Sequence, residues 1–325
     1  MSVNSGCQLT IMEKHKIAVI DCGTNTFHLL IASLDGDGKY QLVHRERRPV
    51  MIGKGGINQQ FISESGQMRA LKALEHFQEI IHRHGTTHVV ATATSAFRNA
   101  NNGKALAERI FKETGITIDI ISGSQEAEYI YEGVRAALPL QGTSMIMDIG
   151  GGSVEFIICN TTDILWKESF EIGAQRLLDH FEIADPISEK NIQELLQYFE
   201  SKLKHLDIAV KKYQPATLIG ASGTFDTLSD IYVIHHNLAV SPNASELPLS
   251  YDSFVYSLDE MTMKNREERL EIPGMAEMRV DMIVVACWLI KYVLEICSIR
   301  NIRVSAFALK EGVLKSFTQQ LIANQ

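Results

Sequence analysis

The amino-acid sequence predicts an α/β protein made of two domains. Apolar segments with strand periodicity alternate along the chain with segments of helical periodicity, which is typical of α/β folds. A strand–turn–strand unit also occurs twice, once in each half of the chain. The length of 325 residues exceeds what one hydrophobic core usually organises, so two domains of roughly 150 residues each are expected.

The first half begins with a hairpin and continues with alternating helices and strands. The short apolar run 17–20 ends at Asp21, and an apolar strand resumes at 27–32 after the turn GTNT. A Ser-Gly-Ser turn later places Glu126 near the first turn of a helix. The intervening elements are predicted as helices at 63–83 and 104–113 and strands at 87–93 and 117–121.

The second half repeats this beginning and then becomes largely helical. The run 145–147 ends at Asp148, and an apolar strand resumes at 154–159 after three glycines. The longest apolar run, 282–290, is nine residues long, too short to span a bilayer, and therefore predicts a buried helix. The other predicted elements are a strand at 216–219, helices at 188–212, 225–232 and 251–296, and loops at 246–250 and 271–274.

The two hairpins are related in sequence. Aligning Asp21 with Asp148 superimposes IAVIDCGTNTFHLLI on SMIMDIGGGSVEFII, with matching apolar positions and with Thr26 over Ser153. Each turn leads into a strand, which excludes the P-loop and the dinucleotide fingerprint because their glycines open a helix. We therefore predict an internal repeat of one supersecondary unit.

The glycine turn of the second hairpin predicts a phosphate site. Glycines let backbone N–H groups approach an anion closely, and the TNT turn of the first hairpin offers hydroxyls and an amide for the same purpose. Strand alternation puts Ser153 and Glu155 on one face, and the carboxylates of Asp148 and Glu155 suit a hard cation such as Mg²⁺. A plain glycine-rich turn beside a solvated glutamate is the alternative, which the duplication disfavours.

Three further segments offer groups of suitable chemistry, each with a structural alternative. Ser95 and Arg98 follow the strand 87–93, and a guanidinium suits a phosphate, although an arginine there is often a surface residue. Glu126 either complements a helix dipole or acts as a general base. Ser222 and Gly223, in GASGT, either cap the next helix or present its amides to an anion.

The net charge, the cysteines and the N-terminal segment argue against several classes of protein. The formal net charge of -8 argues against nonspecific nucleic-acid binding, which relies on a basic surface. The five cysteines form no CxxC pair, which argues against a disulfide framework and against a zinc site. The N-terminal segment lacks a signal-peptide pattern, so we expect a cytoplasmic protein without a membrane partner.

The sequence resembles the exopolyphosphatase and guanosine pentaphosphate phosphohydrolase family (Ppx/GppA) over about residues 17–316. The resemblance rests on the order and spacing of IDCGTNTFHLLIA, ATATSAFRNANN, IISGSQEAEYIYEGV, MDIGGGSVEF, IGASGT and RVSAFALKEGVL. It implies two ribonuclease-H-like domains of the actin-like ATPase superfamily with a cleft between them. The first would comprise residues 1–124 and 306–325, and the second residues 125–305.

The resemblance also implies an activity, a cofactor and an assembly. These are Mg²⁺-dependent hydrolysis of terminal phosphate from inorganic polyphosphate or guanosine pentaphosphate, with Mn²⁺ as an alternative cation, and a homodimer. Longer members continue into a C-terminal HD-type region, and the resemblance here is to the short form without it. The segment SAFALKEG departs from the usual Ser-Asp start and Leu-Arg-Glu-Gly end, so we assign no ligand contact to it.

Matched by position, the resemblance assigns roles to individual residues. Glu126 matches the catalytic base, and Asp21, Asp148 and Glu155 form the expected metal set. The expected phosphate-binding residues are Thr24, Asn25, Thr26, Ser95, Arg98, Gly150, Gly151, Gly152, Ser153, Ser222 and Gly223. Basic residues that could line the approach are Arg45, Arg47, Arg48, Lys54 and Arg266.

Two other functions use similar residues. A small-molecule kinase of the same superfamily would use a carboxylate to activate a substrate hydroxyl. A noncatalytic sensor would bind a guanosine alarmone or ATP and signal by domain closure. Retention of all three acids disfavours the sensor.

Overall fold

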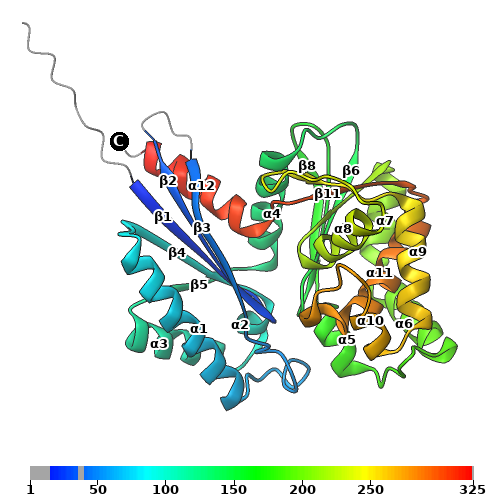
Figure 1. Ribbon diagram of the computed structural model, residues 1–325, viewed down its shortest axis with the longest axis horizontal. Coiled ribbons are helices and arrows are strands. Elements are labelled where there is room, and N and C mark those ends of the chain that lie inside the picture. Colours follow the sequence, from blue (N-terminus) through cyan, green and yellow to red (C-terminus); the bar gives the residue numbers. More distant parts are fainter. Residues whose placement is uncertain (1–14, 36–39, 324–325) are drawn as a thin grey trace, which may run out of the picture.

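The computed structural model describes residues 15–35 and 40–323 and confirms an α/β architecture with two sheets (Figure 1). The first sheet has the strand order β3-β2-β1-β4-β5. Its central strand β1 pairs antiparallel with β2 and parallel with β4. Its strands are β1 (His15–Cys22), β2 (Thr26–Leu34), β3 (Tyr40–Pro49), β4 (His88–Ala93) and β5 (Ile118–Ile120).

The second sheet repeats this topology and adds one edge strand. Its order is β10-β11-β9-β6-β7-β8, in which the central strand β6 pairs antiparallel with β7 and parallel with β9. Both halves are therefore ribonuclease-H-like, and the predicted duplication of the hairpin is confirmed. The strands are β6 (Ser144–Ile149), β7 (Val154–Cys159), β8 (Ile164–Phe170), β9 (Thr217–Ala221), β10 (Glu246–Leu247) and β11 (Asn301–Ser305).

One loop prediction is partly wrong. Residues 246–250 were expected to form a loop, but Glu246 and Leu247 form the short strand β10. They pair antiparallel with Ser305 and Val304 of β11. This pairing comes from a distant segment, so local sequence gave no sign of it.

The predicted helices form largely where serine residues can cap them. Ser63, Ser122, Ser188 and Ser250 each accept a hydrogen bond from the backbone N–H three residues later, which satisfies one unpaired donor of the first turn. The helices of the first half are α1 (Glu64–Arg83), α2 (Ser95–Asn99) and α3 (Gly103–Thr114). Those of the second are α5 (Ala174–His180), α6 (Glu189–Lys202), α7 (Lys204–Tyr213), α8 (Gly223–His235), α9 (Tyr251–Met263), α10 (Arg266–Leu270) and α11 (Met282–Cys297), with a 3₁₀ turn at Glu277–Arg279.

The apolar run 282–290 forms the buried helix that was predicted. It opens α11, whose side chains belong to the core of the second half together with Met145 and Met147 of β6. Within the described residues, no helix combines the length and apolar character needed to cross a membrane. Cys22, Cys159 and Cys287 are buried free thiols, whereas Cys7 and the N-terminal segment considered for a signal lie outside the described residues.

Two helices, α4 (Gly123–Ala137) and α12 (Leu309–Ala323), lie between the sheets (Figure 1). Their apolar side chains share one core with Ile17 and Val19 of the first sheet and with Ile146 of the second. The helices cross closely, since a Cβ on Gly312 would lie 1.7 Å from the carbonyl oxygen of Tyr129. Because α4 contacts elements of both halves, the domain boundary at residue 124 stays a prediction.

Candidate active site

The turns of the two homologous hairpins meet face to face. A Cβ on Gly151 would lie 2.8 Å from Nδ2 of Asn25, and a Cβ on Gly152 would lie 2.7 Å from Oγ1 of Thr24. Glycine lets the turns approach this closely, because a side chain there would displace the side chains of the opposite half. The glycines therefore serve the contact between halves as well as the turn itself.

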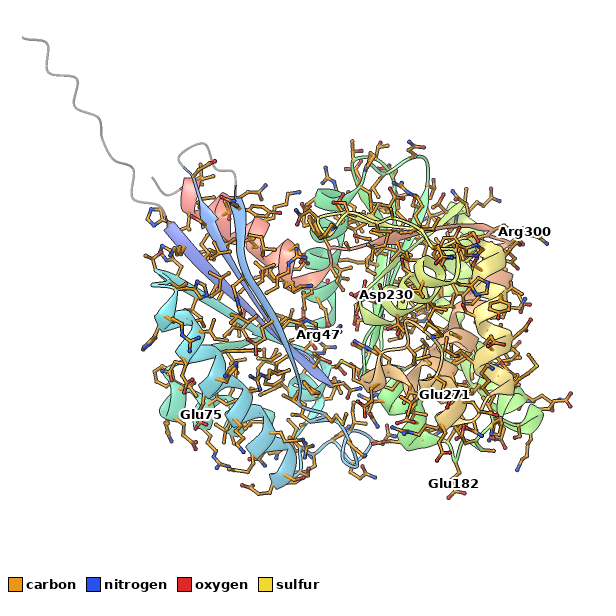
Figure 2. All side chains as sticks on the ribbon, viewed as in Figure 1. Arg47, Glu75, Glu182, Asp230, Glu271 and Arg300 are labelled. Atoms are coloured by element: carbon orange, nitrogen blue, oxygen red, sulfur yellow. The ribbon has the colours of Figure 1, made fainter. Side chains whose placement is uncertain are left out.

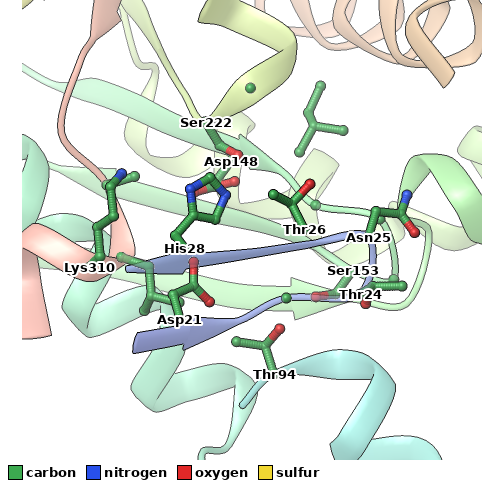
Figure 3. Close-up of a pocket in the computed structure, with 18 of the residues that line it drawn as sticks. Asp21, Thr24, Asn25, Thr26, His28, Thr94, Asp148, Ser153, Ser222 and Lys310 are labelled. Atoms are coloured by element: carbon green, nitrogen blue, oxygen red, sulfur yellow. The ribbon is translucent and has the colours of Figure 1, made fainter. Parts of the chain in front are cut away.

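A cavity of about 110 Å³ lies between the hairpins (Figure 3). The cavity brings together residues of β1, β2, β6, β7, α4 and the start of α8. Of the residues predicted from the sequence, those that line it are Asp21, Thr24, Asn25, Thr26, Glu126, Asp148, Gly150, Gly151, Gly152, Ser153, Glu155, Ser222 and Gly223.

Five carboxylates line this cavity, and four of them come from the two hairpins and α4, while the fifth is Asp226 of α8. Asp148 and Glu155 are register partners on β6 and β7, and Asp21 pairs with His28 at the equivalent position of β1 and β2. Glu126 comes from the first turn of α4. Three of these acids are almost completely buried, with exposed fractions of 6% for Glu126 and Asp148 and 1% for Glu155, and Asp21 is half-buried.

Burial changes the acidity of this group. Desolvation raises the pKa of Asp21 to about 7, of Asp148 to about 6 and of Glu155 to about 8. It raises the pKa of Glu126 well above its usual value, and the nearby Glu155 adds to this effect. The charged forms of the four acids are thus poorly compensated by the protein alone.

The oxygen atoms of the cavity fit a hard divalent cation. Oδ1 of Asp21, Oδ1 of Asn25 and Oγ1 of Thr26 are buried without a hydrogen-bond partner. Across residues 15–35 and 40–323, no three His, Cys, Asp or Glu side chains come close enough to hold a metal ion by themselves. The three unpartnered oxygens are donors of the kind that a hard divalent cation takes together with waters and substrate phosphates.

The segment GASGT serves the cavity in a way that a helix cap does not explain. Ser222 makes no side-chain cap for α8, and its hydroxyl bonds Asp148, which partly offsets the effect of burial on the pKa of that acid. Its φ of 74° and ψ of 175° fall in a region that is essentially reserved for glycine. A Cβ on Gly223 would lie 2.2 Å from Nη2 of Arg279, so that guanidinium covers the start of α8.

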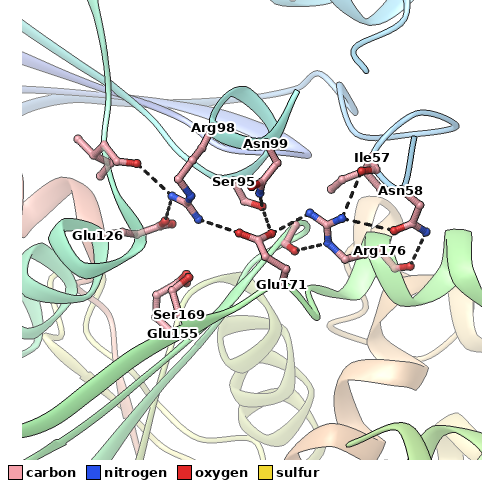
Figure 4. A network of polar contacts seen from close by, with 12 residues as sticks. Ile57, Asn58, Ser95, Arg98, Asn99, Glu126, Glu155, Ser169, Glu171 and Arg176 are labelled. Carbon is pink, nitrogen blue, oxygen red and sulfur yellow. Dashed lines mark hydrogen bonds and ion pairs between the residues drawn. The ribbon is translucent and has the colours of Figure 1, made fainter. Parts of the chain in front are cut away.

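Glu126 lines the cavity and does not cap its helix. The cap of α4 is Ser122, whereas Oε2 of Glu126 lies 2.9 Å from Nη1 of Arg98 (Figure 4). Arg98 and Ser95 lie beside the cavity and do not line it. In the described arrangement Arg98 also donates to the carbonyl oxygen of Ile121 over 3.1 Å.

Several residues of the cavity escaped sequence analysis. They are His28, Asp226, Arg279 and Lys310, whereas Arg47 was expected along the approach. Arg47 lies on the side of the first half that faces Asp230 of the second (Figure 2). Lys310 belongs to the segment SAFALKEG, to which the sequence assigns no ligand contact. Arg279 carried no signal at all.

Three of the other basic residues considered for an approach channel have acidic partners, and the fourth, Lys54, is exposed. Arg45 pairs with Glu311, Arg48 with Glu46 and Arg266 with Asp281. Of these candidates, the structure brings only Arg47 to the cavity among the described residues.

Comparison with known proteins assigns the chain to a family. The profile of the Ppx/GppA phosphatase family matches residues 30–321. The chain belongs to the Ppx/GppA phosphatase family. The solved structure of an exopolyphosphatase from Cytophaga hutchinsonii is 44% identical to this chain, with a TM-score of 0.92, and the alignment covers 94% of this chain and 98% of that one. A solved Ppx/GppA member from Aquifex aeolicus is 25% identical, with a TM-score of 0.76 and coverage of 94% and 98%.

Two curated Ppx/GppA relatives differ in length. A Haemophilus influenzae protein named as a candidate exopolyphosphatase is 30% identical over 302 residues, which is 93% of this chain and 91% of the relative. A guanosine-5'-triphosphate,3'-diphosphate pyrophosphatase of Pseudoalteromonas translucida is 28% identical over 312 residues, which is 95% of this chain but 60% of the relative. The chain therefore spans the part that the longer Ppx/GppA proteins share with the shorter ones.

Proposed function

We propose that the protein hydrolyses the terminal phosphoanhydride bond of inorganic polyphosphate or of guanosine pentaphosphate. The observation that carries this proposal is the meeting of two homologous hairpin turns over a cavity lined by the buried carboxylates of Glu126, Asp148 and Glu155. Backbone amides and hydroxyls of both turns would bind the oxygens of the terminal phosphoryl group. The names of the relatives agree with these two substrates.

Glu126 is the proposed general base. Its carboxylate would accept a proton from the attacking water while the water oxygen attacks the terminal phosphorus and the chain oxygen leaves. Burial raises the pKa of Glu126 well above its usual value, which makes the carboxylate a stronger base. The hydrogen bond from Arg98 orients the carboxylate and favours its ionised form.

The cations of the cavity would act on the phosphate oxygens. Lys310 and Arg279 reach the cavity from the C-terminal part of the chain, and their charges favour an anionic substrate. A bound divalent cation, for which Mg²⁺ is our specific proposal, would neutralise phosphate charge and order water. Asp21, Asp148 and Glu155 would hold it, directly or through its waters.

One assay tests the proposed function directly. Initial rates of orthophosphate release should be measured with short polyphosphate, long polyphosphate, guanosine pentaphosphate and ATP, each with Mg²⁺ and with a chelator. We expect release without any acceptor from at least one of the first three substrates, and loss of that release with the chelator. Absence of orthophosphate from every substrate would sink the proposal.

The same assay separates the two alternatives. Release without an acceptor excludes a kinase, because a kinase must pass the phosphoryl group to a hydroxyl. A sensor would bind a guanosine nucleotide in calorimetry and yield no orthophosphate on prolonged incubation. The preference between polyphosphate and guanosine pentaphosphate follows from the ratio of their kcat/KM values.

A further inference from the structure

The carboxylate of Glu171 joins the two halves beside the cavity (Figure 4). Glu171 follows β8 in the second half, and both of its oxygens have partners. Oε1 lies 3.3 Å from Nη2 of Arg98, which belongs to the first half. Oε2 accepts hydrogen bonds from Oγ of Ser95 over 2.6 Å and from Nη2 of Arg176 over 2.7 Å.

We propose that Glu171 is a positioning residue for the hydrolysis reaction, which holds Arg98 against Glu126 and keeps the two halves closed. This inference rests on the proposed function for its catalytic part. Its structural part, the closure of the halves, stands on the contacts alone. None of the expectations drawn from the sequence included Glu171.

The first step of the argument is the connection from Glu171 to the base. One end of the Arg98 guanidinium, Nη1, bonds Glu126, while the other end, Nη2, bonds Glu171. A guanidinium is planar and rigid, so fixing one end fixes the direction of the other. Glu171 thus determines the angle at which Arg98 meets the carboxylate of Glu126.

The second step is the connection from Glu171 to the glycine turn. Arg176, held by Glu171, donates from Nε to the carbonyl oxygen of Gly152 over 3.0 Å. Its Nη1 donates to the carbonyl oxygen of Ile57 in the first half over 3.2 Å. The same arginine therefore contacts the proposed phosphate turn and the opposite half of the molecule.

The third step is closure. Nδ2 of Asn58 donates to the carbonyl oxygen of Arg176 over 3.2 Å, and the N–H of Gly55 donates to Oδ2 of Asp179 over 3.0 Å. These bonds, with those of Glu171, close one edge of the junction over the cavity. Only 12% of the Arg176 side chain and 19% of the Arg98 side chain are exposed, so solvent screens these two charges incompletely.

The contacts of Glu171 also allow a role opposite to positioning, which can be tested. A carboxylate between two arginines could compete with a substrate phosphate for the same guanidinium groups. Its removal would then raise kcat/KM. A positioning role predicts a fall in kcat instead, because Arg98 and Glu126 would lose their fixed geometry.

The experiment uses Glu171→Ala, the isosteric Glu171→Gln and a control, Glu168→Ala. Glu168 lies on the adjacent β8 and pairs with His205 at the surface, away from the cavity. We expect Glu171→Ala to lower kcat at least about tenfold with KM changed less than about threefold. Glu171→Gln should fall between it and the wild type, and Glu168→Ala should match the wild type.

A second readout does not depend on activity. Small-angle X-ray scattering of the substrate-free protein should give a larger radius of gyration for Glu171→Ala than for the wild type and for Glu168→Ala. If Glu171→Ala does not fold, the isosteric Gln variant carries both measurements. If the wild type hydrolyses none of the substrates, the proposed function has failed, and the scattering comparison still decides whether Glu171 closes the halves.

Two results would overturn the inference. A rise in kcat/KM for either Glu171 variant would mean that Glu171 competes with substrate. Unchanged kcat together with an unchanged radius of gyration would mean that its contacts position nothing.

Discussion

Asp148 and Glu155 lie directly opposite each other across the β6–β7 hairpin, and both are almost completely buried. Two like charges at opposite positions of an antiparallel pair repel each other, and burial strengthens the repulsion. Hydrogen bonds from Ser222, Ser153 and Ser169 offset only part of this effect. The two carboxylates of this hairpin therefore repel each other when both are ionised. Binding of a cation or of a proton would reduce this repulsion.

The repulsion between these buried carboxylates predicts that, without divalent cations, the stability of the protein depends on pH. The ordinary pKa values of 3.8 and 4.5 apply to the unfolded chain, and burial raises those of the folded state to about 6 for Asp148 and about 8 for Glu155. The folded state binds these protons more tightly, so its free energy of unfolding falls as pH rises through that range. Thermal unfolding in a chelator should give a lower Tm at about pH 8 than at about pH 5.5.

Cation binding supplies the control for that prediction. Mg²⁺ should raise Tm more at the higher pH, where the carboxylates are ionised and bind it. Asp148→Asn should weaken both the pH dependence and the response to Mg²⁺. Equal responses to Mg²⁺ at both pH values would contradict a cation site at these carboxylates.

Exchange of Glu126 for Gln tests the proposed base. The amide keeps the size of the side chain but cannot accept the proton of the attacking water, so kcat should fall by about 10² to 10⁴-fold. Circular dichroism and Tm should stay close to those of the wild type. The matched control is Glu128→Gln on the same helix, where the carboxylate pairs with Lys167. Near-normal kcat in Glu126→Gln would rule out this assignment.

The backbone conformation of Ser222 predicts that two small substitutions differ in their effect on the free energy of unfolding. Both Ser222→Gly and Ser222→Ala remove the hydroxyl that bonds Asp148, but only glycine relaxes the φ of 74°. A non-glycine residue in this region costs about 1–3 kcal/mol. Denaturant unfolding should therefore find the Gly variant more stable than the Ala variant by about 1 kcal/mol. The reverse order would mean that the site holds no such strain.

Replacement of Lys310 by Met tests a residue that the sequence did not reveal as functional. Its Nζ lies 3.3 Å from Oε1 of Glu311, and the charge also offsets those of Asp21 and Asp226. We expect Lys310→Met to lower kcat/KM roughly tenfold, mainly through a higher KM, and to lower Tm, because acids lose their counter-charge.

Lys315→Met on the same helix is the control for Lys310. Lys315 forms an ion pair with Glu132 over 2.7 Å and does not line the cavity. Its loss should leave kcat/KM within about twofold of the wild type, as is usual for ion pairs at the surface. Equal effects of the two substitutions would remove Lys310 from the proposed site.

Local sequence was enough to predict the parts of this fold that local physics controls. The apolar runs that end at Asp21 and Asp148 gave both hairpins, since a strand needs only alternation and a turn. Helical periodicity behind Ser63 and Ser188 gave α1 and α6. Strands β3 and β8 were missed because neither is a continuous apolar run, and β3 carries many exposed charged residues.

Some residues of the candidate site could likewise be predicted from local sequence, and others could not. Repetition of the hairpin indicated Asp148, Glu155 and the glycine turn, because their spacing is fixed within one strand pair. Their roles, the homodimer, the cytoplasmic location and the domain boundaries stay predictions. Only the tertiary structure brought Lys310 and Arg279 to the cavity and Glu171 between Arg98 and Arg176. These contacts join segments far apart in the chain, and their geometry depends on how two sheets pack around α4 and α12, which no local periodicity encodes.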